Sequence, residues 1–281
     1  MRNAFTPRSP INAMKLLPDD VDSNIDFDRR FGGIARLYGA DGLARLRASR
    51  VAIVGLGGVG SWAAEACARS GVGSLSLIDL DHVAESNINR QIHALDSTLG
   101  AAKVGAMARR IDDINPQCAV EAIEEFVEAD NVAALIPASR FNCVIDAIDN
   151  VRAKTALIAH CHAQGTPLIT IGGAGGRTDA SRVRVADLAH TEHEAMLAKV
   201  RKALRTHHDF PRNLKKTFGV TAVYSDERAD QRSIAGEDLE QQSREGLTGL
   251  NCAGFGSSVA VTATFGFVAA GLLVDRLARG Q

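Results

Sequence analysis

The stretch VAIVGLGGVG, residues 51–60, decides the fold that this sequence predicts. Its first residues form an apolar run that stops at Gly55, which is typical of a buried strand. Gly57, Gly58 and Gly60 follow, and a helical pattern starts directly after them. Glycines at such a turn let a phosphate approach the backbone at the amino terminus of the helix. The stretch therefore predicts a nucleotide-binding strand–turn–helix unit, although nicotinamide and flavin enzymes and purely structural turns share this pattern.

Outward from this unit, strand patterns alternate with helical patterns. We expect helices at residues 28–47, 60–70, 103–114 and 151–164, and strands at residues 51–55, 74–79, 119–125, 142–147 and 167–171. Parallel strands joined by right-handed helical crossovers form a doubly wound sheet. The sequence therefore predicts an α/β fold with a mostly parallel, Rossmann-like sheet, in which the alternation ends after about Ala189.

Composition excludes several classes of protein. The 281 residues carry 32 basic and 33 acidic side chains, so a polybasic nucleic-acid-binding chain is excluded and any such contact must come from a local patch. Such a patch is available at residues 197–216, where seven cations accompany one acid. The five cysteines form no CxxC pair, which argues against a disulfide framework and against a four-thiolate zinc site. We therefore expect a cytoplasmic protein without structural zinc.

Charged side chains follow the predicted strands at the edge where ligands bind in open α/β sheets. Asp79 ends the second predicted strand and is placed to bind a ribose hydroxyl, while Arg90 and Lys103 come later in the same connection. Asp149 follows the strand at residues 142–147. One acid for ribose, two cations for phosphates and a second acid for Mg²⁺ suit phosphoryl or nucleotidyl transfer. Hydride transfer needs none of these groups.

Five sequence features around these residues resemble those of the ubiquitin-activating-enzyme-like (ThiF/MoeB/HesA) superfamily, whose members adenylate carboxylates. They are GLGGVG, LIDLD, NINRQ, Lys103 and DAIDN. Longer strings are similar to the tRNA threonylcarbamoyladenosine dehydratase branch, from about Phe27 to the C-terminus: RFGGIARLYG, VGSWAAEA, NRQIHAL, GGAGG and VTATFGFVA. This resemblance implies ATP and Mg²⁺ as cofactors, a homodimer, and tRNA carrying threonylcarbamoyladenosine as the partner. A cysteine desulfurase or sulfur-acceptor system is a further partner that it suggests.

The resemblance also implies roles for individual residues. Arg90 reaches the triphosphate, Lys103 neutralises it, and Asp149 positions Mg²⁺. The catalytic set includes Arg30, which would act across the dimer, but Gly33 replaces the arginine expected three residues later, so Arg36 is an alternative. The implied nucleotide-binding set is Gly55, Gly57, Gly58, Gly60, Asp79, Asn87, Arg90, Gln91, Lys103, Asp149 and Asn150.

The reaction implied is ATP-dependent dehydration of N6-threonylcarbamoyladenosine in tRNA to its cyclic form. AMP transfer to the threonine carboxylate makes a mixed anhydride, and the carbamoyl group then closes the ring by intramolecular attack, which has a large entropic advantage. The alternative is activation of the C-terminal glycine of a ubiquitin-like sulfur carrier. A third possibility is a non-enzymatic scaffold that retains ATP binding.

By composition and resemblance, we divide the chain into four regions. Residues 1–26 form a flexible extension, 27–189 the ATP-binding adenylation domain, 190–250 a charged crossover that contacts substrate, and 251–281 an apolar terminal helix packed on the main domain. Residues 259–274 are long enough to span a membrane, but neighbouring and internal hydroxyls favour a buried helix without stable membrane insertion. Cys252 lies outside the main sheet region, and we expect a buried cysteine there rather than a thioester or persulfide nucleophile.

Overall fold

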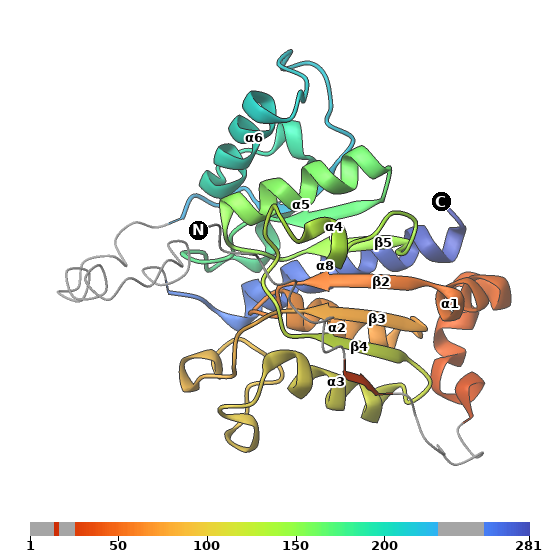
Figure 1. The fold of residues 1–281 in the computed structure, drawn as a ribbon. Coiled ribbons are helices and arrows are strands. Elements are labelled where there is room, and N and C mark those ends of the chain that lie inside the picture. The colour runs from red at the N-terminus through yellow and green to blue at the C-terminus, as the bar shows by residue number, and fades with distance from the viewer. Residues whose placement is uncertain (1–13, 17–25, 230–255) are drawn as a thin grey trace, which may run out of the picture.

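The fold is an eight-stranded, mostly parallel sheet with helices on both faces (Figure 1). The computed structural model describes residues 14–16, 26–229 and 256–281. The strand order is β1-β4-β3-β2-β5-β6-β8-β7, and only the two edge pairs, β1 with β4 and β7 with β8, are antiparallel. The strands are β1 (Met14–Leu16), β2 (Arg50–Val54), β3 (Ser74–Ile78), β4 (Ala119–Ile123), β5 (Cys143–Asp146), β6 (Leu168–Ile171), β7 (Val183–Asp187) and β8 (Thr221–Ser225).

Two helical layers cover the sheet. The apolar side chains of α1 (Phe27–Ala48), α2 (Gly60–Arg69), α3 (Lys103–Ile114) and α8 (Val259–Arg279) pack against one face. Those of α4 (Val132–Leu135), α5 (Val151–Gln164) and α6 (Ala195–His207) pack against the other. Short 3₁₀ helices fill the connections: η1 (Glu85–Asn87), η2 (Asp96–Thr98), η3 (Ala180–Arg182) and η4 (Leu188–His190). Because both faces are covered, the buried residues of β2 are all apolar, as expected for a parallel strand, and β5 is apolar up to the buried Asp146 at its end.

The terminal helix α8 is a core helix in this fold. Val261, Phe265 and Leu273 are fully buried, and the helix packs on α1 and α2. A Cβ on Gly266 would lie 2.5 Å from the Val59 carbonyl oxygen, so only glycine permits this close approach to the start of α2. By length and apolar composition α8 could also cross a membrane, and half of its most apolar window is buried inside the protein. Its packing therefore fits the buried helix that the sequence predicted.

The predicted α/β class and doubly wound sheet are confirmed. Helices α3 and α5 begin and end at the predicted residues. One expectation was wrong, because the alternation does not end after Ala189: β8 follows α6 and pairs in parallel with β6. Strand β7 was also missed, since its residues are only partly buried at the edge of the sheet and include exposed Arg184. The four-region division of the chain stays a prediction.

Candidate functional site

The candidate site lies where the strand order reverses. From β2 the chain adds β3 and β4 on one side, and β5, β6 and β8 on the other. The loops that leave the carboxyl ends of β2 and β5 therefore diverge, and open α/β sheets bind ligands at such a point. The glycine turn after β2, Asp79 after β3 and the loop carrying Asp149 after β5 all lie at this edge.

The four glycines of the turn meet very different surroundings. Gly55 has φ +87°, a left-handed conformation that other residues rarely adopt. A Cβ on Gly60 would lie 1.8 Å from the Gly55 carbonyl oxygen, so the turn closes on itself there. A Cβ on Gly58 would lie 3.0 Å from Cγ of Arg90, whereas one on Gly57 would meet nothing within 4 Å among the described residues. The open side of the turn is therefore at Gly57, where a phosphate could approach.

Asp79 is tied to this turn through its carboxylate. Its Oδ2 accepts a hydrogen bond of 2.6 Å from the Leu56 amide, and its Oδ1 accepts one of 2.8 Å from the Asp81 amide. Burial raises the pKa of Asp79, while the charge of Lys103 and these two amides oppose that shift. Each carboxylate oxygen keeps acceptor capacity, so the position suits a ribose hydroxyl.

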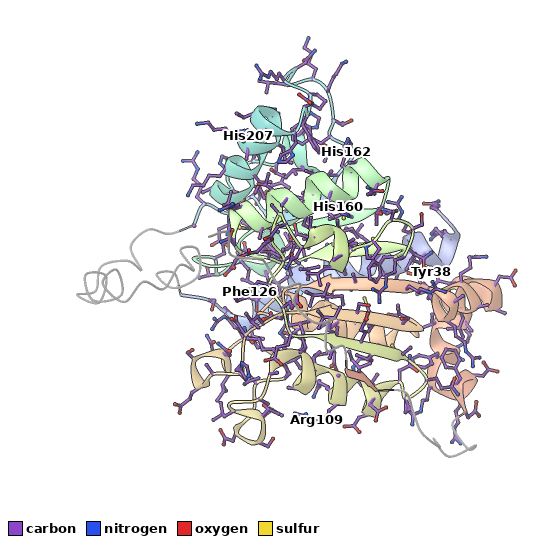
Figure 2. All side chains as sticks on the ribbon, viewed as in Figure 1. Tyr38, Arg109, Phe126, His160, His162 and His207 are labelled. Atoms are coloured by element: carbon purple, nitrogen blue, oxygen red, sulfur yellow. The ribbon has the colours of Figure 1, made fainter. Side chains whose placement is uncertain are left out.

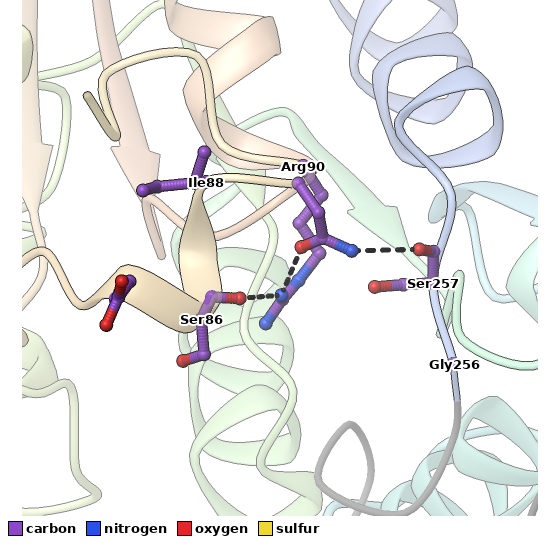
Figure 3. A pocket seen from close by; sticks show the side chains of 7 residues that line it. Ser86, Ile88, Arg90, Gly256 and Ser257 are labelled. Atoms are coloured by element: carbon purple, nitrogen blue, oxygen red, sulfur yellow. Dashed lines mark hydrogen bonds between the residues drawn. The ribbon is translucent and has the colours of Figure 1, made fainter. Parts of the chain in front are cut away.

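The two predicted phosphate cations have internal partners in this structure. The Nζ of buried Lys103 lies 2.7 Å from Oδ2 of exposed Asp81. The Arg90 guanidinium donates to the Ser86 carbonyl at 2.8 Å and to Asn89 Oδ1 at 2.9 Å (Figure 3). These bonds fix the positions of both cations. A triphosphate that binds Lys103 would have to compete with the carboxylate of Asp81.

An open pocket of about 570 Å³ lies beside Arg90. Figure 3 shows Arg90 between the η1 turn and the segment that leads into α8. The side-chain amide of Asn89 connects to that segment by donating a hydrogen bond of 3.1 Å to the Ser257 carbonyl. The indole of Trp62 on α2 donates to the Arg90 carbonyl at 2.9 Å. The pocket lining is Glu85, Ser86, Ile88, Asn89, Arg90, Gly256 and Ser257.

Gln91 and Asn87 differ in how their polar atoms are used. Asn87 Oδ1 accepts from the Ala84 amide at 3.1 Å and so shapes the η1 turn. The buried Oε1 of Gln91 has no hydrogen-bond partner among the described residues. A buried acceptor without a partner is costly, so Gln91 is suited to receive a donor from a ligand.

Asp149 and Asn150 are both exposed at the end of the loop after β5. Asn150 Oδ1 accepts from the amides of Arg152 and Ala153, so this side chain caps the amino terminus of α5. The side-chain oxygen of Asn150, which the resemblance places in the nucleotide-binding set, is thus engaged by the helix, while Asp149 is an exposed carboxylate of this loop.

The two arginines proposed to act across a dimer lie on α1. Arg30 donates to the carbonyl of Ile114 at 2.9 Å, at the end of α3 in its own chain. Arg36 is exposed, as is its neighbour Leu37, which is 71% accessible. Arg30 is therefore engaged within the chain, and this arrangement favours Arg36 for a contact with another subunit.

The cysteines inside the described part of the chain are poor nucleophiles. Cys67, Cys118, Cys143 and Cys161 are buried. Burial raises the pKa of Cys118, Cys143 and Cys161 to about 12, so these thiols stay protonated near neutral pH. Cys252 lies outside the described residues.

Sequence reasoning missed three participants: Asp81, Trp62 and Ser257. Asp81 was visible in the LIDLD motif, two residues after the ribose acid. Ser257 carried no local signal, because its role depends on α8 returning to the carboxyl edge of the sheet.

Residues 29–275 match the ThiF family. The chain belongs to this family. One relative is the tRNA threonylcarbamoyladenosine dehydratase of Haemophilus influenzae. It is 44% identical to this chain, and the match covers 92% of this chain and 97% of the relative. The dehydratase of Escherichia coli is 46% identical, over 86% of this chain and 90% of the relative. The E. coli enzyme, TcdA, has been solved in complex with ATP; it matches with TM-score 0.80 and 42% identity, over 90% of this chain and 96% of TcdA.

The residues present fit ATP with Mg²⁺. The open side of the turn at Gly57 and the unpaired Oε1 of Gln91 provide space and an acceptor. No three His, Cys, Asp or Glu side chains gather into a metal site within residues 14–16, 26–229 and 256–281. Mg²⁺ in ATP sites usually takes one or two carboxylates and completes its shell with phosphate oxygens and water. A single carboxylate, Asp149, therefore suits Mg²⁺ that arrives with the nucleotide.

Proposed function

We propose that this chain catalyses the ATP-dependent dehydration of N6-threonylcarbamoyladenosine in tRNA to its cyclic form. The observation that carries the proposal is the glycine turn that opens at Gly57 at the strand-order reversal, with Arg90 against Gly58. Asp79, which the charge of Lys103 reaches, bonds to the same turn. The dehydratases of Haemophilus influenzae and Escherichia coli match over 97% and 90% of their own length. This near-complete match favours the dehydratase over the alternative, activation of a sulfur-carrier protein.

The chain's own residues supply binding and charge stabilisation. The amides at the start of α2 and the open side of Gly57 receive phosphates, and Asp79 orients the ribose. Arg90 and Lys103 offset the charge that develops on the departing pyrophosphate. Mg²⁺, held by Asp149 and phosphate oxygens, would add positive charge there. The threonine carboxylate becomes a mixed anhydride with AMP, and the neighbouring carbamoyl group displaces AMP while closing the ring, so no enzyme nucleophile is needed.

The proposed tRNA-docking surface is the basic face formed by α6 and the segment after it. Lys199, Lys202, Arg212, Lys215 and Lys216 are exposed there. Figure 2 shows this region, with His207 labelled, projecting at one end of the molecule with side chains extending outward. Exposed lysines and arginines hold nucleic-acid phosphates without reading sequence.

Two other cations of this segment have structural roles. Arg201 donates to Thr191 Oγ1, and Arg205 donates to the Pro211 carbonyl while lying over the Phe218 ring. Residues 226–245 form an acidic stretch that would neutralise the basic segment if the two were in contact. Asp226, at its start, pairs instead with Arg182 and Arg184. Glu227 accepts from the amides of Thr178 and Asp179, and residues 230–245 of the stretch lie outside the described residues. The exposed cations thus stand as the candidate phosphate contacts.

Exchange of pyrophosphate into ATP tests the proposal. We expect exchange that depends on tRNA carrying threonylcarbamoyladenosine and is absent with unmodified tRNA. Exchange that instead depends on the C-terminus of a ubiquitin-like protein would establish the sulfur-carrier function. ATP binding without exchange on either substrate would leave only the scaffold. Mg²⁺ dependence, a homodimer, a cytoplasmic location and a desulfurase partner belong to this proposal.

A further inference from the structure

A fully buried ion pair lies directly behind the loop that carries Asp149. The Nζ of Lys154 on α5 lies 2.9 Å from Oδ2 of Asp146 at the end of β5, and neither side chain is exposed to solvent. Thr170 on β6 donates to the same Oδ2 at 2.7 Å and accepts from Lys154 at 3.2 Å. Three neighbouring elements are joined in this one network.

Stability alone is a weak explanation for such a pair. Removing two charges from water is expensive, and well-packed apolar residues of similar volume often stabilise a core as well or better. The network therefore points to a positional role, which depends on what else its members hold.

The pair holds the backbone of residues 147–150 from two sides. Asp146 Oδ1 accepts from the Ile148 amide at 3.1 Å, and Lys154 donates to the Asp146 carbonyl at 3.2 Å. The Asn150 side chain caps α5, the helix that carries Lys154. Asp149 lies between these fixed points.

The same loop also supports the glycine turn. A Cβ on Gly55 would lie 2.9 Å from the Ala147 carbonyl oxygen, and one on Gly60 would lie 3.1 Å from Ala147 Cβ. The backbone at Ala147 is therefore packed against the turn without free space, so a displaced loop would displace the phosphate cradle as well.

We propose that Asp146 and Lys154 are positioning residues for magnesium-bound ATP. Their ion pair, bridged by Thr170, sets the loop 147–150 so that Asp149 faces the nucleotide phosphates across the glycine turn. This inference rests on the proposed function for the role of Asp149.

The test is the double variant Asp146→Asn with Lys154→Met, which removes both charges while keeping side-chain volume and the acceptor for the Ile148 amide. We expect a melting temperature within a few degrees of wild type. The affinity for ATP in the presence of Mg²⁺ should fall about tenfold, and ATP affinity in EDTA should fall by a smaller factor, because only the shift of the glycine turn acts there. A small displacement of a positioning group can cost this much or more.

A matched control is Glu65→Gln with Arg110→Met, which removes another ion pair with one buried partner, between α2 and α3. The control should keep the wild-type effect of Mg²⁺ on ATP affinity. Should the first double variant fail to fold, Thr170→Val removes only the bridging hydroxyl, and a weaker shift in the same direction is expected.

A folded variant with wild-type ATP affinity in Mg²⁺ overturns the inference, as does an unchanged Thr170→Val. These binding measurements need no tRNA. Failure of the proposed function would instead appear as wild-type protein that binds ATP but shows no exchange with modified tRNA.

Discussion

Gly57 and Gly60 stand three residues apart in one turn, yet a methyl group would have opposite consequences at the two positions. At Gly60 it would collide with the Gly55 carbonyl, so Gly60→Ala should lower the free energy of unfolding by about 3 kcal/mol. At Gly57 it would point into the open space, so Gly57→Ala should fold normally and bind ATP about tenfold more weakly. Thermal melts and ATP titrations of the two variants check this. Unchanged ATP affinity in Gly57→Ala would place the phosphates elsewhere.

Arg90 and Lys103 are expected to act on charge in the transition state. Arg90→Ala and Lys103→Ala should each reduce pyrophosphate exchange by about 10²–10³-fold with the fold intact. Arg109 provides the control, because it is exposed on the same helix as Lys103 and lies away from the site. Arg109→Ala should exchange at the wild-type rate. Near-normal exchange in Arg90→Ala or Lys103→Ala removes that residue from the mechanism.

His93 makes stability depend on pH. It is 2% exposed, and burial, followed by the charges of Lys103 and Arg110, lowers its pKa to about 4. An unfolded histidine binds a proton below about pH 6.5, so between pH 6.5 and 4 the unfolded state binds more protons and the native state loses stability as pH falls. At pH 5 this loss should be about 2 kcal/mol relative to pH 8.

Urea unfolding of wild type and His93→Met at the two pH values measures this contribution. Between pH 8 and pH 5, the free energy of unfolding of His93→Met should fall by about 2 kcal/mol less than that of wild type. His207→Gln, at an exposed position on α6, serves as the control and should retain the wild-type loss. Equal losses in wild type and His93→Met would mean that other groups carry the pH dependence.

Among the elements, α6 carries part of the surface that we propose for tRNA docking. Changing Lys199, Lys202 and Lys215 together to glutamate should weaken binding of modified tRNA and flatten its dependence on salt, because fewer counterions are released. ATP affinity should not change. Binding measured across a salt series checks this, and unchanged affinity and slope would move the docking surface elsewhere. Arg201 and Arg205 are left intact because their contacts support the helix.

The elements also show how far local sequence signals reach. Helices α3 and α5 and the apolar strands could be placed from periodicity and glycines, because those signals lie within each segment. Strand β7 is partly exposed at the edge, so its apolar pattern is weak. The Asp79 and Lys103 positions followed from motif spacing. By contrast, the Lys154–Asp146 pair and the contact between Asn89 and Ser257 depend on tertiary packing, which no local pattern encodes.

At the scale of the whole molecule, the exposure of Arg36 on α1 lets it reach the site of a second subunit in the proposed homodimer. Mixing subunits that carry different substitutions tests this. In Arg36→Ala and Asp149→Ala homodimers, every site would lack one of the two groups. Random re-pairing makes half of the dimers mixed, and each mixed dimer then contains one intact site and one doubly altered site. Mixing and re-pairing the two inactive variants should therefore restore about a quarter of the wild-type exchange rate.

The same mixing with Arg30→Ala separates the two arginines. Arg30 bonds to the end of α3 in its own chain, so Arg30→Ala should mainly lower stability and keep substantial exchange before any mixing. If exchange recovers when Asp149→Ala is mixed with Arg30→Ala but not with Arg36→Ala, Arg30 is the arginine that acts across the dimer. If re-paired subunits recover nothing with either arginine variant, each site is complete within one chain, and the exposed face of α1 serves another purpose.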